Sequence, residues 1–106
     1  MRASLSLAAA AMLLMSMPPV SAASRSYTVV IDKMKFGPVP AGLRVGDRIV
    51  WVNRDMFRHT ATAKDGSFDV DLPPKGSATT IVRKAGALNV VCRYHPAMRA
   101  VLTIAK

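Results

Sequence analysis

From residue 24 onward the chain is a series of short runs rich in Val, Ile and Thr, and this pattern restricts the fold more than any other feature of the sequence. The runs are 27–31, 48–53, 59–63, 77–82, 88–92 and 99–104. β-Branched and aromatic residues favour strands, whereas the Gly, Pro, Asn and Asp residues between the runs favour turns. No segment in this part of the chain repeats its apolar positions with a helical period of useful length. The sequence therefore predicts an all-β fold, a Greek-key β-sandwich of seven or eight strands.

Alternation within the runs predicts which side chains enter the core. Arg48–Asn53 is the strongest run, but both of its alternating sets are apolar, so periodicity leaves its core face open. In the run that precedes the loop near residue 95, alternation places Leu88, Val90 and Cys92 on one face. We also expect residues 34–36 to continue the first strand in an extended conformation.

Residues 1–23 differ from the rest of the chain. They begin with a positive charge, continue through 5–17 almost entirely as Leu, Ala and Met, and end in small residues after two prolines. This order is typical of a secretory signal peptide, and the apolar run is too short for a stable transmembrane helix, which needs roughly 20 residues. We expect cleavage after Ala22 or Ala23 and a mature domain of residues 24–106 that is periplasmic or secreted, without stable membrane insertion. An uncut membrane anchor is the alternative.

The chain is strongly basic, with a formal net charge of +9 and no glutamate. Such a charge favours association with an acidic partner through long-range steering. Nucleic acid is the other usual partner of a basic chain. Export argues against nucleic acid, and so does the distribution of charge, because no run of consecutive basic residues is longer than two. We therefore expect an acidic protein partner and no nucleic acid.

The chain has a single cysteine, Cys92, so it cannot form an internal disulfide. Small exported domains usually depend on disulfides, and a lone exported thiol is open to oxidation and cross-linking. A buried cysteine is often an inert hydrophobic residue, and this is the simpler interpretation. Binding to a metal would both protect the thiol and stabilise the folded state.

Side chains that bind soft metals gather around this cysteine. Cys92, His95 and Met98 lie within seven residues, and His59, the other histidine, follows the strongest strand-like run. Taken singly, these residues fit an inert thiol, solvated histidines and a core methionine. Taken together, a thiolate and two imidazoles favour copper or zinc, and an added thioether favours copper. A thiolate at a strand end, with an imidazole and a thioether on a tight loop, can reach the same point.

The chain from residue 27 to residue 106 resembles the cupredoxins, the type 1 blue copper proteins, and is most similar to their amicyanin- and plastocyanin-like members. The loop Cys92-x-x-His95-x-x-Met98 is similar to the shortest common ligand loop of that group. The segments Trp51–Asn53 and Ala85–Gly86 also resemble the family before its first ligand histidine and before its ligand cysteine. The resemblance implies a cupredoxin β-sandwich that binds one copper ion.

The resemblance also implies the roles of individual residues. His59, Cys92, His95 and Met98 would bind the copper ion, and the protein would be a small soluble carrier of single electrons between redox partners. It would be a monomer. It would not be an enzyme, because the coordination positions are filled and a catalytic metal needs an open one. An acidic redox partner would dock near His95. The alternative function is a periplasmic copper-binding protein for copper delivery or storage.

The chain departs from the family pattern at three positions beside two of its expected ligands. Arg58 and Thr60 flank His59 where the family often has Pro and Asn, and Tyr94 precedes His95 where Pro is common. Thr60 can still supply a hydrogen bond next to the site. We expect an apolar docking rim around the site, surrounded by arginines. The expected rim residues are Met56, Phe57, Pro96 and Ala97, and the expected arginines are Arg58, Arg93 and Arg99.

Overall fold

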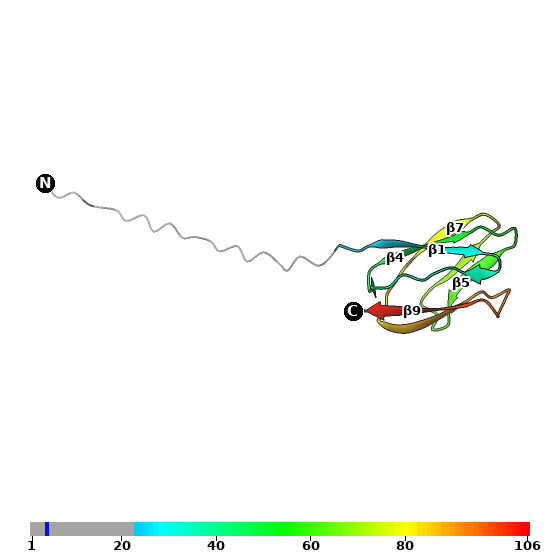
Figure 1. The fold of residues 1–106 in the computed structure, drawn as a ribbon. Coiled ribbons are helices and arrows are strands. Elements are labelled where there is room, and N and C mark those ends of the chain that lie inside the picture. Colours follow the sequence, from blue (N-terminus) through cyan, green and yellow to red (C-terminus); the bar gives the residue numbers. More distant parts are fainter. Residues whose placement is uncertain (1–3, 5–22) are drawn as a thin grey trace.

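The computed structural model describes Ser4 and residues 23–106 (Figure 1). The predicted signal peptide, residues 1–23, lies almost wholly outside the described residues, so its cleavage stays a prediction. Within the described part of the chain, no helix has the length and apolar character needed to cross a bilayer.

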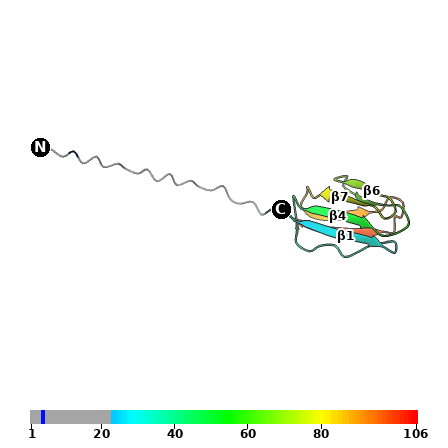
Figure 2. The same cartoon turned by 90° about the horizontal axis from the view of Figure 1, so that it is seen from above.

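The described residues form nine strands in two stacked sheets (Figures 1 and 2). Four strands in the order β2-β1-β4-β7 make one sheet, and five in the order β3-β9-β8-β5-β6 make the other. The predicted all-β sandwich is confirmed, and the count exceeds eight because β2 and β3 are pieces of only two residues. The strands are β1 Ser26–Asp32, β2 Lys35–Phe36, β3 Leu43–Arg44, β4 Arg48–Asn53, β5 His59–Ala63, β6 Asp69–Leu72, β7 Ser77–Ile81, β8 Gly86–Val91 and β9 Arg99–Ala105.

The chain moves between the sheets early, and this produces parallel pairs in a mostly antiparallel fold. After β2 the proline-rich segment 37–42 carries the chain to the edge of the other sheet, where β3 lies parallel to β9. The chain then returns, and β4 lies parallel to β1. Prolines suit such a crossover because they cannot donate to a strand ladder. Gly37 begins it, and a side chain there would meet the Val30 carbonyl oxygen at 2.7 Å.

The expectation that residues 34–36 continue extended is wrong at Met34, whereas Lys35 and Phe36 are extended and form β2. Lys33 and Met34 have φ values of 51° and 62°, and the chain reverses there into β2. Two consecutive positive φ values are typical of a tight two-residue hairpin turn, which usually contains Asn or Gly. This turn contains neither residue, and it is held instead by Asp55, whose carboxylate accepts the amide hydrogens of Lys33 and Met34 at 2.8 and 2.9 Å.

The core lies between the two sheets and is centred on Trp51. On β4, Ile49, Trp51 and Asn53 are buried, which settles the core face that periodicity left open. Trp51 donates its indole hydrogen to Thr80 at 3.0 Å and has aromatic neighbours on both sides. The predicted inward face of the run through β8 is confirmed, because Leu88, Val90 and Cys92 are all buried.

Candidate metal centre

Two neighbouring strands position the first pair of candidate ligands. His59 is the first residue of β5, and Cys92 directly follows the last residue of β8. These strands are antiparallel, so the start of one and the end of the other lie at the same end of the sandwich. Both side chains point into the core, where His59 is 0% and Cys92 1% exposed.

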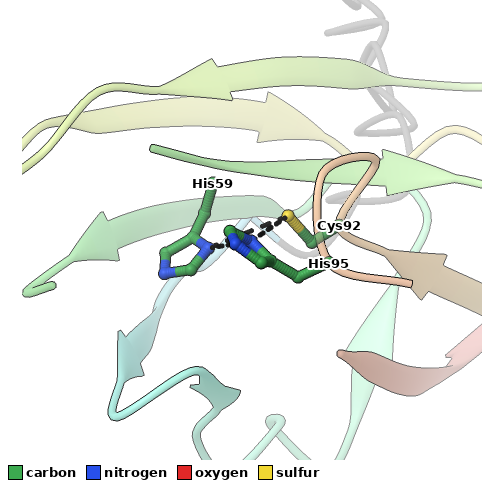
Figure 3. Close-up of side chains that lie close together, drawn as sticks. All are labelled: His59, Cys92 and His95. Atoms are coloured by element: carbon green, nitrogen blue, oxygen red, sulfur yellow. Dashed lines mark hydrogen bonds between the residues drawn. The ribbon is translucent and has the colours of Figure 1, made fainter. Parts of the chain in front are cut away.

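Three ligand atoms converge at this end of the fold (Figure 3). The two histidine Nδ1 atoms are 3.2 Å apart, and the sulfur of Cys92 lies 3.8 Å from Nδ1 of His59 and 3.6 Å from Nδ1 of His95. Metal bonds of about 2.0 Å to nitrogen and about 2.3 Å to sulfur, set at 120°, would separate nitrogen donors by roughly 3.5 Å and nitrogen from sulfur by roughly 3.7 Å. The observed separations therefore fit three ligands around one ion.

A carboxylate turns His59 toward this cluster. Nε2 of His59 lies 2.7 Å from Oδ2 of Asp55. An ionised carboxylate only accepts hydrogen bonds, so Nε2 carries the hydrogen, and in the neutral imidazole Nδ1 is left with a lone pair. That lone pair faces Cys92 and His95, which is the arrangement that a histidine ligand requires.

The loop that carries the remaining candidates is closed by its own backbone. The amide of Cys92 donates to the carbonyl of Met98 at 3.3 Å, and the amide of Met98 donates to the carbonyl of His95 at 2.8 Å. Met98 is 4% exposed and belongs to the same core cluster as Cys92. The loop thus returns Met98 to the interior, while the His95 ring stays half-buried at the surface.

Comparison with known proteins agrees with this geometry. The family model described as a cupredoxin-like domain matches residues 5–104. The chain belongs to the cupredoxin-like family. Amicyanin from Paracoccus versutus is 30% identical over 90 residues, which cover 76% of this chain and 68% of that protein.

Solved amicyanin structures share the fold of this cupredoxin. A variant in the Cu(I) form has a TM-score of 0.65 at 24% identity, over 78% of this chain and 85% of the other. An oxidised variant has a TM-score of 0.64 at 23% identity, over 74% and 80%. The predicted resemblance to cupredoxins, and to amicyanin in particular, is confirmed.

The cofactor of this cupredoxin is one copper ion. The family match is joined here by a thiolate and two imidazoles that converge on one point, and this donor set is the one that blue copper sites use. Cupredoxins of the amicyanin kind are blue copper electron carriers, and this chain has their fold and their donors.

Asp55 is a residue of the site that sequence reasoning missed. Burial raises the pKa of its carboxyl, but hydrogen bonds from the Met34 amide, the His59 ring and the Lys33 amide outweigh burial and bring the pKa below its ordinary value of 3.8. The group is therefore ionised at neutral pH and only accepts hydrogen bonds. Its position four residues before a predicted ligand histidine is the signal that could have identified it.

Thr60 forms hydrogen bonds to Cys92 and to the residue that follows it. Its amide lies 3.4 Å from the Cys92 sulfur, to which it donates, and its hydroxyl accepts the amide hydrogen of Arg93 at 2.8 Å. The backbone amide of Thr60, and not its hydroxyl, donates to the sulfur. The donated hydrogen supplies partial positive charge to the sulfur atom.

Apolar side chains that neighbour the two candidate histidines in the sequence are exposed. Met56, Phe57 and Tyr94 are 73%, 61% and 52% exposed, and Pro96 and Ala97 are exposed beside them. Two of the three expected arginines are paired with carboxylates. Arg58 pairs with Asp71, and Nε of Arg93 lies 3.4 Å from Asp69, both carboxylates being on β6.

A small basic pocket lies beside the ligand loop. It has a volume of about 230 Å³, and Cys92 contributes to its wall. Three cationic side chains line it, and no carboxylate does. They are Lys64, Arg93 and Arg99.

Proposed function

We propose that the mature domain, residues 24–106, is a periplasmic carrier of single electrons. One copper ion would be bound by Nδ1 of His59, Sγ of Cys92 and Nδ1 of His95, and the thioether of Met98 would be a weaker fourth ligand. The observation that carries this proposal is the convergence of the three donor atoms, all within 4.8 Å of one another, at separations that suit a single ion.

The protein's part in electron transfer is to hold the donors still. When bound, copper supplies the one-electron Cu(I)/Cu(II) couple. Asp55 fixes the His59 ring, the Thr60 amide is directed at the Cys92 sulfur, and two backbone bonds close the loop. Fixed donors change little between oxidation states, so little reorganisation accompanies transfer.

The half-buried His95 ring is the proposed route for electrons in and out of the site. It is the candidate ligand next to the exposed apolar residues, and an apolar surface can be dried by a docking partner. The basic pocket beside the loop would accept carboxylates of an acidic redox protein. The carrier would work as a monomer and turn over no substrate, because a filled coordination shell leaves no position for one.

Copper delivery or storage is the alternative function. A delivery site must give its ion to another protein, so its thiolate has to be reachable. The structure buries His59 and Cys92 at 0% and 1% exposure, and this burial favours the electron carrier.

The test is the visible spectrum of the protein, purified without metal and given one equivalent of Cu(II). An electron carrier of this kind shows an intense blue or green thiolate-to-copper band, which Cys92→Ser abolishes. Tyr94→Phe is the matched control on the same loop and keeps the band. A colourless protein that binds only Cu(I) would favour delivery, and a protein that binds neither ion would refute both functions.

A further inference from the structure

Arg93, the residue directly after Cys92, is held at both its backbone and its side chain. Its amide donates to Thr60 Oγ1 at 2.8 Å, and its guanidinium Nε lies 3.4 Å from Oδ1 of Asp69. Thr60 lies on β5 and Asp69 on the neighbouring edge strand β6. Two strands therefore hold the residue that follows the candidate thiolate ligand.

Two threonine hydroxyls join these contacts into a closed ring. Oγ1 of Thr60 lies 2.9 Å from Oγ1 of Thr62, and Oγ1 of Thr62 lies 2.8 Å from Oδ1 of Asp69. The ring thus runs from the Arg93 amide through Thr60, Thr62 and Asp69 and back to the Arg93 guanidinium.

The carboxylate of Asp69 fixes the direction of every hydrogen bond in this ring. A carboxylate only accepts, so the one hydroxyl hydrogen of Thr62 goes to Asp69. Thr62 must then accept from Thr60, whose only hydroxyl hydrogen is used in that bond. Thr60 is left with lone pairs for the Arg93 amide, and its hydroxyl hydrogen is given to Thr62.

We propose that Asp69 is a positioning residue for the copper site and acts through this ring. By fixing the direction of the Thr60–Thr62 bond, it keeps the Arg93 amide bonded and holds Thr60, whose own amide is directed at the Cys92 sulfur. The effect on copper rests on the proposed function, whereas the effect on the amides exists without metal.

The chain contains a matched control for Asp69. Asp71 lies two residues further along the same strand, and it also pairs with an arginine, Arg58. The two carboxylates have similar side-chain exposure, 46% for Asp69 and 44% for Asp71. Asp69→Asn and Asp71→Asn therefore remove the same charge from the same strand, but only the first changes a member of the ring. The amide of Asn can donate as well as accept, so it no longer fixes the direction of the Thr62 hydrogen bond.

The first experiment uses the metal-free protein and measures amide hydrogen exchange of Thr60 and Arg93 by NMR. We expect the Arg93 amide to exchange at least tenfold faster in Asp69→Asn than in wild type, and Asp71→Asn to match wild type. Thr62→Val breaks the ring without changing charge and should have the same effect as Asp69→Asn. Equal exchange in all of these variants would overturn the proposal, whether or not the protein binds copper.

The second experiment measures the reduction potential of the copper-loaded protein. Asp69→Asn and Thr62→Val should both change the ratio of Cu(II) to Cu(I) at fixed potential at least threefold, which is about 28 mV at 59 mV per tenfold. Thr60→Ser, which keeps the hydroxyl, should stay at the wild-type potential. Equal shifts in Asp69→Asn and Asp71→Asn, with none in Thr62→Val, would show that charge alone acts and would refute the role of the ring.

Discussion

Asp55 shows how single residues of this site serve two structural elements at once. Its carboxylate bonds to the ring of His59 and to both amides of the β1–β2 turn. The turn residues Lys33 and Met34 adopt positive φ without being glycine, so the turn needs these bonds. One carboxylate therefore links the orientation of a candidate copper ligand to the closing of a hairpin in the other sheet.

Replacing this carboxylate should weaken copper binding. We expect Asp55→Asn to lower Cu(II) affinity by about 10- to 100-fold, because a partner that orients a ligand histidine typically contributes this much. It should also destabilise the metal-free protein by about 1–3 kcal/mol through its lost charged hydrogen bonds. Competition with a chelator and urea unfolding measure the two effects.

Asp65→Asn is the control for this prediction, because among the described residues Asp65 accepts hydrogen bonds only within its own turn, from the amide of Ser67. Its copper affinity should equal that of wild type. An Asp55→Asn protein with wild-type affinity would contradict the orienting role of the carboxylate.

The candidate metal ligands could be proposed from the sequence, whereas the residues that position them could not. Cys92 and His95 are close in sequence, and ligand chemistry restricts them to few residue types. Asp55 and the Thr60–Thr62–Asp69 ring are ordinary polar residues, and their partners lie up to 33 positions away. Only strand pairing brings them together, and no local pattern reports it.

At the scale of the single strand, the alternation of buried and exposed side chains decides which substitutions destabilise the protein. In β9, Leu102 is 0% exposed and its neighbour Val101 is 52% exposed. We expect Leu102→Ala to destabilise the protein by about 2–5 kcal/mol, as loss of a buried side chain leaves a cavity. Val101→Ala should stay within about 0.5 kcal/mol of wild type.

Urea unfolding followed by the fluorescence of Trp51, the only tryptophan, measures both variants. Equal destabilisation by the two substitutions would mean that the register of β9 against β8 is wrong.

Alternation alone could not identify the buried face of β4, because its Val50 and Val52 are as apolar as the buried Ile49 and Trp51. There the packing of Trp51 between Phe36 and Phe68, from other strands or loops, selects the face.

At the scale of the whole molecule, Asp47 ties distant parts of the chain together at the end where β1 begins and β9 ends (Figure 1). Its carboxylate accepts the amide hydrogens of Arg25 and Arg44, and these bonds lower its pKa below the ordinary value of 3.8. A lowered pKa contributes stability that is present above pH 3.8 and is lost as pH falls through the folded-state value.

We therefore expect the metal-free protein to lose stability below about pH 4, and Asp47→Asn to flatten this dependence. Above that pH, the variant should be less stable than wild type. Urea unfolding at a series of pH values measures the effect, and Asp32→Asn, which alters an exposed carboxyl, is the control. The same acid slope in wild type and Asp47→Asn would contradict the prediction.

The chain has a net charge of +9, and we expect the positions of its cationic side chains to affect the steering of a partner as well as their number. On β6 Asp69 and Asp71 pair with arginines, whereas no carboxylate lines the pocket that contains Lys64 and Arg99. This pocket is close to the ligand loop. The far end of β9 is about 20 Å from Arg99, because a strand rises about 3.3 Å per residue. This distance is roughly two Debye lengths at 0.1 M salt.

We expect Lys64→Glu/Arg99→Glu to slow reduction of the copper-loaded protein by hexacyanoferrate(II) severalfold at low salt, because this anion should be steered to the pocket. The difference from wild type should shrink toward 1 M salt, where the Debye length is about 3 Å. Arg44→Glu/Lys106→Glu makes the same change in charge at the end where β3 pairs with the end of β9. Stopped-flow rates that fall equally in both double variants would show that only total charge steers the reductant, and the pocket would have no special part in docking.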